Sequence, residues 1–237
     1  MEQHTWKQAA QALAGVSVTA HPNNEPVTII GIADGFRCIG VGTDAAVFQS
    51  ASAPEYAFKV YADGKMDKLE AEAEVYAQIG PSPYFSTCYG KDERMLILKY
   101  EEGPTLFDCL LQGVYVPKQA IVDVEKARDY IREIGLNPRD IHLKNIILQN
   151  GRAKLLDVSE YIKPGNDFRW EHLKKAYEEY YSIIDGKPVP FWLLDTIRKW
   201  YHHWQRYSLS FDEFMRIVFK QVIHLLRQGR AHADLEI

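Results

Sequence analysis

The hydrophobic pattern of the first hundred residues predicts several strands and one main helix. At residues 65–79 apolar side chains recur at helical spacing, and this helix is expected to end at the Gly80-Pro81 pair. A shorter helix is expected at 5–14, near the start of the chain. Runs rich in branched and aromatic residues predict strands on both sides of the main helix. The predicted strands cover 27–33, 35–42, 45–51, 56–62 and two shorter stretches within 88–100.

Beyond residue 104 the pattern becomes mostly helical. One hairpin interrupts it at Asn150-Gly151, a dipeptide typical of a tight two-residue turn. The predicted class is α+β, with a bilobal layout that leaves a cleft between a β-rich N-lobe and a mostly helical C-lobe. We expect an N-terminal extension at 1–30, an N-lobe at 31–100 and a C-lobe at 101–237. The predicted helices of the second half are 116–135, 170–184, 191–204 and 211–228.

Composition narrows the functional classes. The chain has 237 residues, a hydrophobic content of 46% and a net charge of -4, which indicates a folded protein without the basic excess of a nucleic-acid binder. Its three cysteines, Cys38, Cys88 and Cys109, are far apart and form no CxxC pair, so we expect reduced thiols. Neither a secretory signal nor a run of roughly 18 apolar residues is apparent. We therefore expect a cytoplasmic protein with no membrane or nucleic-acid partner.

Two glycines, Gly40 and Gly42, lie where one predicted strand turns into the next. Glycines let backbone N–H groups approach phosphates closely. Two turn glycines in an ordinary hairpin would give the same pattern, and this reading stays open. No Lys-Ser/Thr follows to make a Walker loop, and a strand rather than a helix follows, which excludes a Rossmann fingerprint.

Lys59 interrupts an apolar strand and shares a face with Ala57 and Tyr61. A lysine there either extends to solvent or needs a buried partner. The main helix offers Glu72 on the side that should turn inward, whereas Glu70 and Glu74 belong to its solvated side. A pair between Lys59 and Glu72 would orient the ammonium towards a phosphate.

The stretch LNPRDIHLKNIILQN, at residues 136–150, places Asp140 and Asn145 just before the predicted hairpin. A second carboxylate, Asp157, follows the hairpin. Mg²⁺ prefers oxygen ligands and is often held by one or two carboxylates together with substrate phosphates. The combination suits a magnesium site, although Asp157 alone would be read as a turn or cap residue.

Taken in order, these residues resemble the protein-kinase-like fold over roughly residues 35–165. The resemblance implies that Gly40 and Gly42 cover the phosphates of ATP, with Ala45 where a third glycine is common, and that Lys59 contacts the α- and β-phosphates while paired with Glu72. It also implies a catalytic base at Asp140 and Mg²⁺ ligands at Asn145 and Asp157. The remaining nucleotide-binding residues that it implies are Val47, Ala57, the gatekeeper Leu98, and the backbone of Lys99, Tyr100 and Glu101.

Several positions depart from the usual protein-kinase pattern. Pro138 stands where the catalytic loop usually begins with His. Ser/Thr kinases usually have Lys two residues after the base, whereas this chain has His142, which is similar to aminoglycoside-type kinases. His142 could support the loop or line the acceptor site. The triplet Asp-Val-Ser at 157–159 is similar to that of RIO-type kinases, and no Ala-Pro-Glu follows it. The only hydroxyl side chains between Asp157 and Trp170 belong to Ser159 and Tyr161, so a long phosphorylatable segment is not expected.

The expected activity is ATP- and Mg²⁺-dependent phosphoryl transfer to a hydroxyl, with protein serine or threonine as the first choice of acceptor. Two alternatives remain open. The first is a small-molecule kinase on the same fold, favoured by His142 and the short segment after Asp157. The second is a nucleotide-binding pseudokinase scaffold, against which the presence of all five polar site positions argues.

Overall fold

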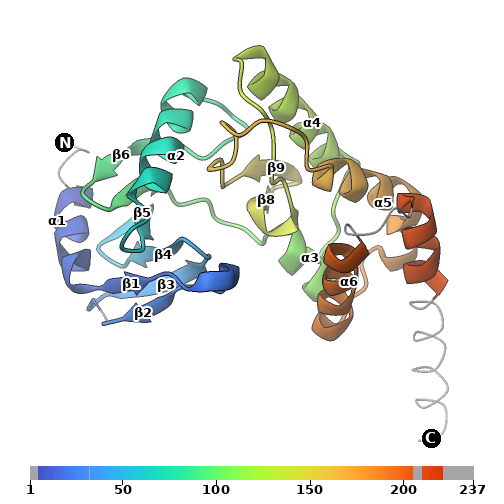
Figure 1. Ribbon diagram of the computed structural model, residues 1–237, viewed down its shortest axis with the longest axis horizontal. Coiled ribbons are helices and arrows are strands. Elements are labelled where there is room, and N and C mark those ends of the chain that lie inside the picture. Colours follow the sequence, from blue (N-terminus) through green and yellow to red (C-terminus); the bar gives the residue numbers. More distant parts are fainter. Residues whose placement is uncertain (1–4, 32, 205–209, 221–237) are drawn as a thin grey trace, which may run out of the picture. The chain divides into compact units, whose positions relative to one another are not determined.

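The computed structural model describes residues 5–31, 33–204 and 210–220 (Figure 1). The chain forms two compact units. The first contains Met1–Leu106 and Pro117–Arg169, and the second contains Phe107–Val116 and Trp170–Ile237. The predicted α+β class is confirmed. Residues 117–169 lie in the same compact unit as the sheet, so the units divide the chain differently from the predicted lobes. The lobe boundaries stay a prediction.

A five-stranded sheet in the order β3-β4-β5-β7-β6 is the centre of the first unit (Figure 1). All its neighbouring strands are antiparallel. The middle strand carries apolar residues on both faces and is buried along most of its length, as its unbroken run of branched and aromatic side chains predicts. The strands are β3 (Phe36–Val41), β4 (Ala45–Ser50), β5 (Ala53–Tyr61), β6 (Cys88–Asp92) and β7 (Met95–Lys99).

Residues 5–30 cover one face of this sheet. Leu13 and Val18 are fully buried and share one core cluster with Phe58 and Ile97 of the sheet. The Arg94 guanidinium also donates a hydrogen bond to the carbonyl of Leu13, at 3.3 Å. The predicted first helix is confirmed, but β1 was not predicted because it is only three residues long. The elements are α1 (Thr5–Ala12), η2 (Leu13–Gly15), β1 (Ser17–Thr19), η3 (Pro22–Asn24) and β2 (Thr28–Ile30), with β1 and β2 antiparallel.

The main predicted helix is confirmed as α2 (Met66–Ile79). Its buried side chains include Leu69 and Glu72, while Glu70 and Glu74 are exposed, as the helical spacing predicts. α2 contacts β5, β6 and β7. It therefore brings a buried carboxylate to the sheet.

A helix and a hairpin complete the first unit. They are α4 (Lys118–Glu133) and the antiparallel pair β8 (Ile146–Gln149) and β9 (Arg152–Leu155), preceded by the short η4 (Leu143–Asn145). The predicted turn is confirmed, since Asn150 and Gly151 both have positive φ, at 50° and 77°. Asp123 of α4 accepts hydrogen bonds from the Arg152 side chain and from the Ala153 N–H, which joins the helix to the hairpin.

The second unit is helical in all its described elements. They are α3 (Leu106–Gln112), which begins at the last residue of the first unit, α5 (Arg169–Ile184), α6 (Phe191–Trp204) and a helical stretch at 211–220. The predicted helices at 170–184 and 191–204 are confirmed, and α3 was not predicted. Of the helix predicted at 211–228, residues 221–228 lie outside the described residues. Phe214, Met215 and Val218 form its small buried cluster.

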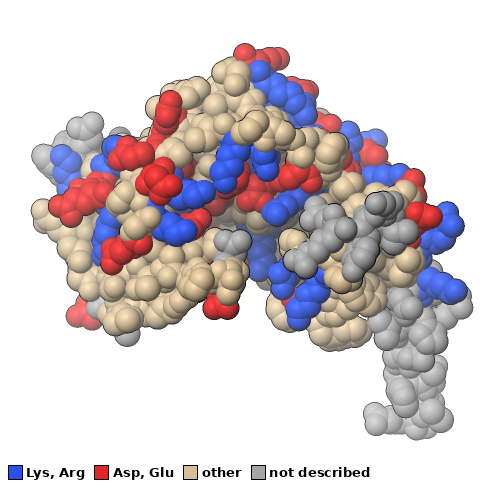
Figure 2. All heavy atoms as spheres, in the orientation of Figure 1, with Lys and Arg blue, Asp and Glu red and all other residues tan. Residues whose placement is uncertain are grey.

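The surface carries charges of both signs. Figure 2 shows lysine and arginine side chains interspersed with aspartate and glutamate on the visible face. Within the described residues, no helix has the length and apolar character needed to cross a membrane.

Candidate active site

The register of the sheet brings the predicted nucleotide-binding residues to one face. Gly40 is opposite Val47, Val47 is opposite Lys59, and Ala57 is opposite Leu98. Directly opposed residues project to the same side, and Ala57 and Lys59 are two positions apart on one strand. The other face of β5 packs instead against the N-terminal elements through Phe58 and its neighbours. Strand pairing alone therefore gathers these residues on one surface.

The glycine turn between β3 and β4 is held by backbone hydrogen bonds. The Gly42 N–H donates to the Ala45 carbonyl at 2.9 Å, and the Gly42 carbonyl accepts from the Val27 N–H at 2.9 Å. At the same turn, Asp44 pairs with Lys65 at 2.6 Å. A Cβ on Gly42 would lie 3.2 Å from the Ala45 carbonyl oxygen, closer than most real side-chain contacts. The glycine at this position thus lets the two strands turn tightly.

Lys59 lies between two carboxylates. Its Nζ is 2.6 Å from Glu72 Oε2 and 3.2 Å from Asp157 Oδ2. The predicted contact between Lys59 and Glu72 is confirmed, and Glu72 is completely buried. The sheet, α2 and the segment after β9 therefore meet at one ammonium group.

Tyr61 completes this cluster, and the sequence did not single it out. Its hydroxyl donates a hydrogen bond to Glu72 Oε2, the same oxygen that contacts Lys59. The Lys59 Nζ also lies 5.5 Å from the centre of the Tyr61 ring. The position of Tyr61 two residues after Lys59, on the same face, was the available signal. A tyrosine with a buried hydroxyl needs a partner, and here Glu72 is that partner.

The charges in this cluster stabilise one another. Burial opposes ionisation of the Lys59 ammonium, but the charges of Asp157 and Glu72 outweigh it and raise the Lys59 pKa above its ordinary value. Burial likewise opposes ionisation of Asp157, but the Lys59 ammonium and the hydrogen bond from the Ser159 N–H lower the Asp157 pKa to about 2. The cluster therefore contains a protonated lysine and an ionised aspartate at neutral pH.

Asp140 lies in the loop before β8, with its backbone in a left-handed conformation at φ 53°. Residues other than glycine seldom adopt this conformation, and such residues cluster at functional sites. The Asp140 N–H donates to Asp167 Oδ2 at 2.8 Å, and the Asp140 carbonyl accepts from Asn145 Nδ2 at 3.2 Å. Its carboxylate forms an ion pair with Arg169 through Oδ1. Asn145 of the loop, together with Asp167 and Arg169 at the start of α5, thus holds Asp140 at both backbone groups and at one carboxylate oxygen.

The surroundings change the acidity of Asp140. Burial raises the Asp140 pKa to about 6, and the nearby charges of Asp157, Asp167 and Glu160 act in the same direction, whereas Arg169 opposes them. The interaction between the Asp140 and Asp157 charges links the loop electrostatically to the Lys59 cluster.

The His142 ring contacts two other residues of the loop, Lys144 and Asp140. Its Nδ1 accepts a hydrogen bond from the Lys144 N–H at 3.3 Å, and its Nε2 lies 4.0 Å from Asp140 Oδ1. Burial and the charge of Arg169 lower the His142 pKa to about 4, so the ring is neutral at pH 7. The ring-to-backbone bond supports the loop. Of the two roles that the sequence left open for this residue, loop support has a contact behind it.

The segment after Asp157 is tied to the same loop. Asn137 Nδ2 donates to the carbonyls of Lys163 and Gly165, each at 2.6 Å. The Arg139 guanidinium donates to the Pro164 carbonyl. These contacts involve backbone carbonyls, so this short segment is held against the loop without a phosphorylated side chain.

The linker at residues 99–103 is anchored to the β8–β9 hairpin. The Glu101 side chain, only 2% exposed, pairs with Lys154 of β9 at 2.8 Å and accepts from Gln149 Nε2 of β8 at 3.1 Å. Gly103 has φ 141°, and a Cβ there would lie 2.4 Å from the Leu148 carbonyl oxygen. The sequence predicted a backbone role for Glu101 and missed its side-chain ion pair, because Lys154 is far away along the chain.

Two predicted metal ligands, Asp157 and Asn145, fit Mg²⁺ by the chemistry of their donor atoms. Asp157 supplies an ionised carboxylate, and Asn145 uses its Nδ2 in the bond to the Asp140 carbonyl, which leaves its Oδ1 as a donor to a cation. Within the described part of the chain, no group of three His, Cys, Asp or Glu side chains is placed to hold a metal. A Mg²⁺ ion here would take its other ligands from phosphates and water.

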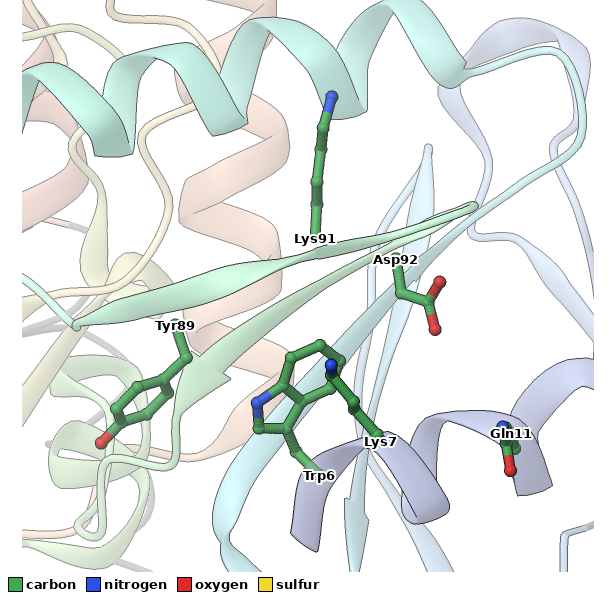
Figure 3. Close-up of a pocket in the computed structure, with 6 residues that line it drawn as sticks. All are labelled: Trp6, Lys7, Gln11, Tyr89, Lys91 and Asp92. Carbon is green, nitrogen blue, oxygen red and sulfur yellow. The ribbon is translucent and has the colours of Figure 1, made fainter. Parts of the chain in front are cut away.

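A separate pocket of about 440 Å³ lies between α1 and β6, away from the predicted site residues (Figure 3). Its walls include Trp6 from α1 and Tyr89 from β6. Figure 3 shows the Lys91 side chain directed away from the Trp6 ring, and its ammonium pairs with Glu70 of α2. None of the residues predicted to bind nucleotide or metal lines this pocket.

Comparison with known proteins adds an independent finding. A Bacillus subtilis (strain 168) protein named "Putative serine/threonine-protein kinase YrzF" is 32% identical to this chain over 159 residues, which is 65% of this chain and 74% of the relative. No protein-family model matches the chain.

Proposed function

The chain belongs to the kinase-like family that includes this Bacillus subtilis protein, and from that premise we propose that it transfers the γ-phosphoryl group of ATP to a hydroxyl acceptor. We propose a serine or threonine of a protein as the acceptor and Mg²⁺ as the required metal. The observation that carries the proposal is the Lys59 ammonium, bonded at once to Glu72 and Asp157. A lysine that is buried, charged and held by two carboxylates suits the binding of a polyphosphate.

The nucleotide would lie on the sheet face that carries Val47, Ala57 and Leu98. The N–H groups of Lys99 and Tyr100 already donate to the carbonyls of Thr87 and Glu55. Among the described residues the Glu101 N–H has no acceptor, so we propose it as the donor to the nucleotide base. The glycine turn at Gly40 and Gly42 would cover the phosphates.

Asp140 would act as the base. In the transfer, a bond forms between the acceptor oxygen and the γ-phosphorus while the bond to the β–γ bridging oxygen breaks, and ADP leaves with that electron pair. The proton of the acceptor hydroxyl passes to the Asp140 carboxylate. Lys59 would hold the α- and β-phosphates, and Asn145 and Asp157 would hold the metal. When bound, Mg²⁺ would neutralise charge on the phosphates.

One observation favours a small-molecule acceptor as the second candidate. The segment after Asp157 is short and is bonded to the loop through Asn137 and Arg139. It therefore offers little chain on which to build a peptide-docking platform. A pseudokinase is a weaker alternative, because Lys59, Glu72, Asp140, Asn145 and Asp157 are all present and the lysine contact is formed.

A transfer assay tests the proposal. The protein is incubated with γ-labelled ATP, Mg²⁺ and a Bacillus subtilis extract that retains its metabolites, and proteins are then separated from metabolites. We expect label in the protein fraction, and a loss of about 10²-fold or more in Lys59→Met and Asp140→Asn, because a positioned base alone contributes about 10²–10⁴ in rate.

Matched controls make the same chemical changes elsewhere in the first unit. Lys91→Met removes a lysine paired with an exposed glutamate, and Asp129→Asn removes an exposed carboxylate of α4. Both should transfer phosphate at the wild-type rate. Equal labelling by wild type, Lys59→Met and Asp140→Asn would contradict the catalytic roles of Lys59 and Asp140. Label in the metabolite fraction alone would favour a small-molecule acceptor. Absence of a thermal shift with millimolar ATP and Mg²⁺ would count against nucleotide binding.

A further inference from the structure

Asp140 has one polar atom that the described residues leave open. Its N–H is bonded to Asp167, its carbonyl to Asn145 and its Oδ1 to Arg169. Oδ1 is also the carboxylate oxygen nearer to His142, at 4.0 Å from Nε2. Within the described part of the chain, no hydrogen bond or ion pair engages Oδ2. The side chains of Asp140 and Arg169 are 31% and 33% exposed, so a molecule from solvent can reach this pair.

We infer that Arg169 is a positioning residue for phosphoryl transfer, which holds Oδ1 of Asp140 so that Oδ2 is the oxygen that takes the proton of the acceptor hydroxyl. The inference rests on the proposed function. Both oxygens of a free carboxylate can rotate into any direction, and an arginine bond to one of them fixes the plane of the group. Arg169 thus acts through Asp140 and does not touch the reacting atoms.

The place of Arg169 in the fold supports this role. Asp167 accepts the Arg169 N–H through Oδ1 at 3.2 Å while its Oδ2 accepts the Asp140 N–H. One aspartate therefore ties the start of α5 to the backbone of the base. Because Arg169 and Asp140 are both held by Asp167, the guanidinium meets the carboxylate in a defined geometry. Arg169 lies 29 positions beyond Asp140, so no local spacing in the sequence revealed the pair.

A positioning role predicts a loss confined to turnover. With the extract fraction that takes label from the wild type, R169M should lower kcat by about 10- to 100-fold, since a misplacement of roughly 1 Å can cost about 10²-fold. The KM for ATP should change by less than about twofold, because Lys59 and Asp157 are untouched. R169K keeps a cationic donor and should recover at least about threefold of the lost kcat, whereas R169Q, which keeps an N–H donor without charge, should recover less.

R132M is the matched control. Arg132 is an exposed arginine of α4 that pairs with Asp129 at 2.9 Å, so R132M removes the same side chain from a surface pair. Its kcat should equal that of the wild type. Thermal unfolding of each variant shows whether it is folded. If R169M is not folded, the kcat values of R169K and R169Q are compared with that of the wild type instead.

Several results would overturn the inference. Turnover by R169M within twofold of wild type, higher turnover than wild type, or equal turnover by R169M and R169K would each exclude positioning of the base by this cation. A rise in the KM for ATP equal to the loss in kcat/KM would place Arg169 in nucleotide binding instead. If the wild type itself transfers no phosphate, the proposed function fails and this inference fails with it, whereas wild-type transfer with unchanged R169M refutes the inference alone.

Discussion

The Lys59 ammonium contacts one carboxylate oxygen of Glu72 and one of Asp157. Lys59 and Glu72 could be paired from the sequence, because strand alternation and helix spacing give the faces on which they lie. The contact of Asp157 with the same ammonium could not be derived from local pattern, since these residues are 98 positions apart. Tyr61 is a further member of this cluster, because its hydroxyl donates to Glu72 Oε2, the oxygen that also contacts Lys59. Among the described residues, the other Glu72 oxygen, Oε1, is buried without a hydrogen-bond partner.

Removal of the Tyr61 hydroxyl should therefore weaken the cluster. In Tyr61→Phe, Glu72 keeps, within the described part of the chain, only the bond to Lys59 in a fully buried site. We expect a loss of about 1–3 kcal/mol in the free energy of unfolding, the usual cost when a buried charged group loses a partner. Urea denaturation followed by fluorescence measures it.

Tyr84→Phe is the control for this change. Tyr84 is half-buried, and its hydroxyl makes no hydrogen bond among the described residues, so the substitution should alter the free energy of unfolding by less than about 0.5 kcal/mol. Equal effects of the two substitutions would contradict a special role for the Tyr61 hydroxyl.

At the scale of elements, one buried carboxylate joins α4 to the β8–β9 hairpin. Asp123 accepts from Arg152 Nε at 2.7 Å, from Arg152 Nη2 at 2.8 Å and from the Ala153 N–H at 3.1 Å. Burial opposes its ionisation, but the bonds from Arg152, Gln119 and Ala153 outweigh it and lower the Asp123 pKa. The hairpin is thereby fixed to the helix next to the loop that carries Asp140.

This carboxylate should make stability depend on pH. The folded pKa of Asp123 lies below the unfolded value of about 4. Unfolding therefore takes up a proton when the pH lies between these two pKa values. Its contribution is complete above pH 4 and is lost as the pH falls through the folded pKa. Asp123→Asn should lower the free energy of unfolding at pH 7 by about 1–3 kcal/mol, and this difference should shrink towards pH 2–3. Urea denaturation at several pH values measures both.

Asp129→Asn serves as the control on the same helix. Asp129 is exposed and pairs with Arg132 one turn away, a kind of pair that contributes little to stability. Its stability should follow that of the wild type at every pH. A constant difference between Asp123→Asn and wild type from pH 7 to pH 2.5 would show that the carboxylate charge of Asp123 contributes nothing.

On the scale of the whole molecule, residues 5–30 are part of the folded first unit. Leu13, Val16 and Val18 are buried in one cluster with Phe58 and Ile97 of the sheet. The backbone adds a bond from the Val27 N–H to the glycine turn. A segment expected to precede the kinase-like region thus covers the sheet face opposite Lys59.

Truncation of Leu13 tests this integration. Leu13→Ala should lower the free energy of unfolding by about 2–5 kcal/mol, the usual range for a leucine removed from a packed core. Thermal unfolding should remain a single transition for the first unit, since the side chain belongs to its common core. Ile30→Ala, which shortens a side chain that is 62% exposed on β2, should change little. A small effect of Leu13→Ala would mean that the N-terminal elements pack only loosely on the sheet.

Local patterns predicted much of the fold. Very short elements and contacts between residues far apart in the chain were not predicted. Alternation gave the sheet strands, helical spacing gave α2, α4, α5 and α6, and Asn150-Gly151 gave the hairpin. The three-residue β1 and the short α3 were missed, because so few residues show no period. At the site, motif order pointed to Lys59, Glu72 and Asp140, but the contacts of Arg169 and Lys154 cross many residues of chain.

The pair between the buried Glu101 and the half-buried Lys154 bears on how the protein responds to heat. Hydration of charged groups carries a negative entropy, so the cost of keeping the two charges out of water falls as temperature rises. Hydrophobic stabilisation, in contrast, reaches a plateau. The attachment of the linker to the hairpin therefore contributes a larger share of the stability of the first unit at high temperature than at low temperature.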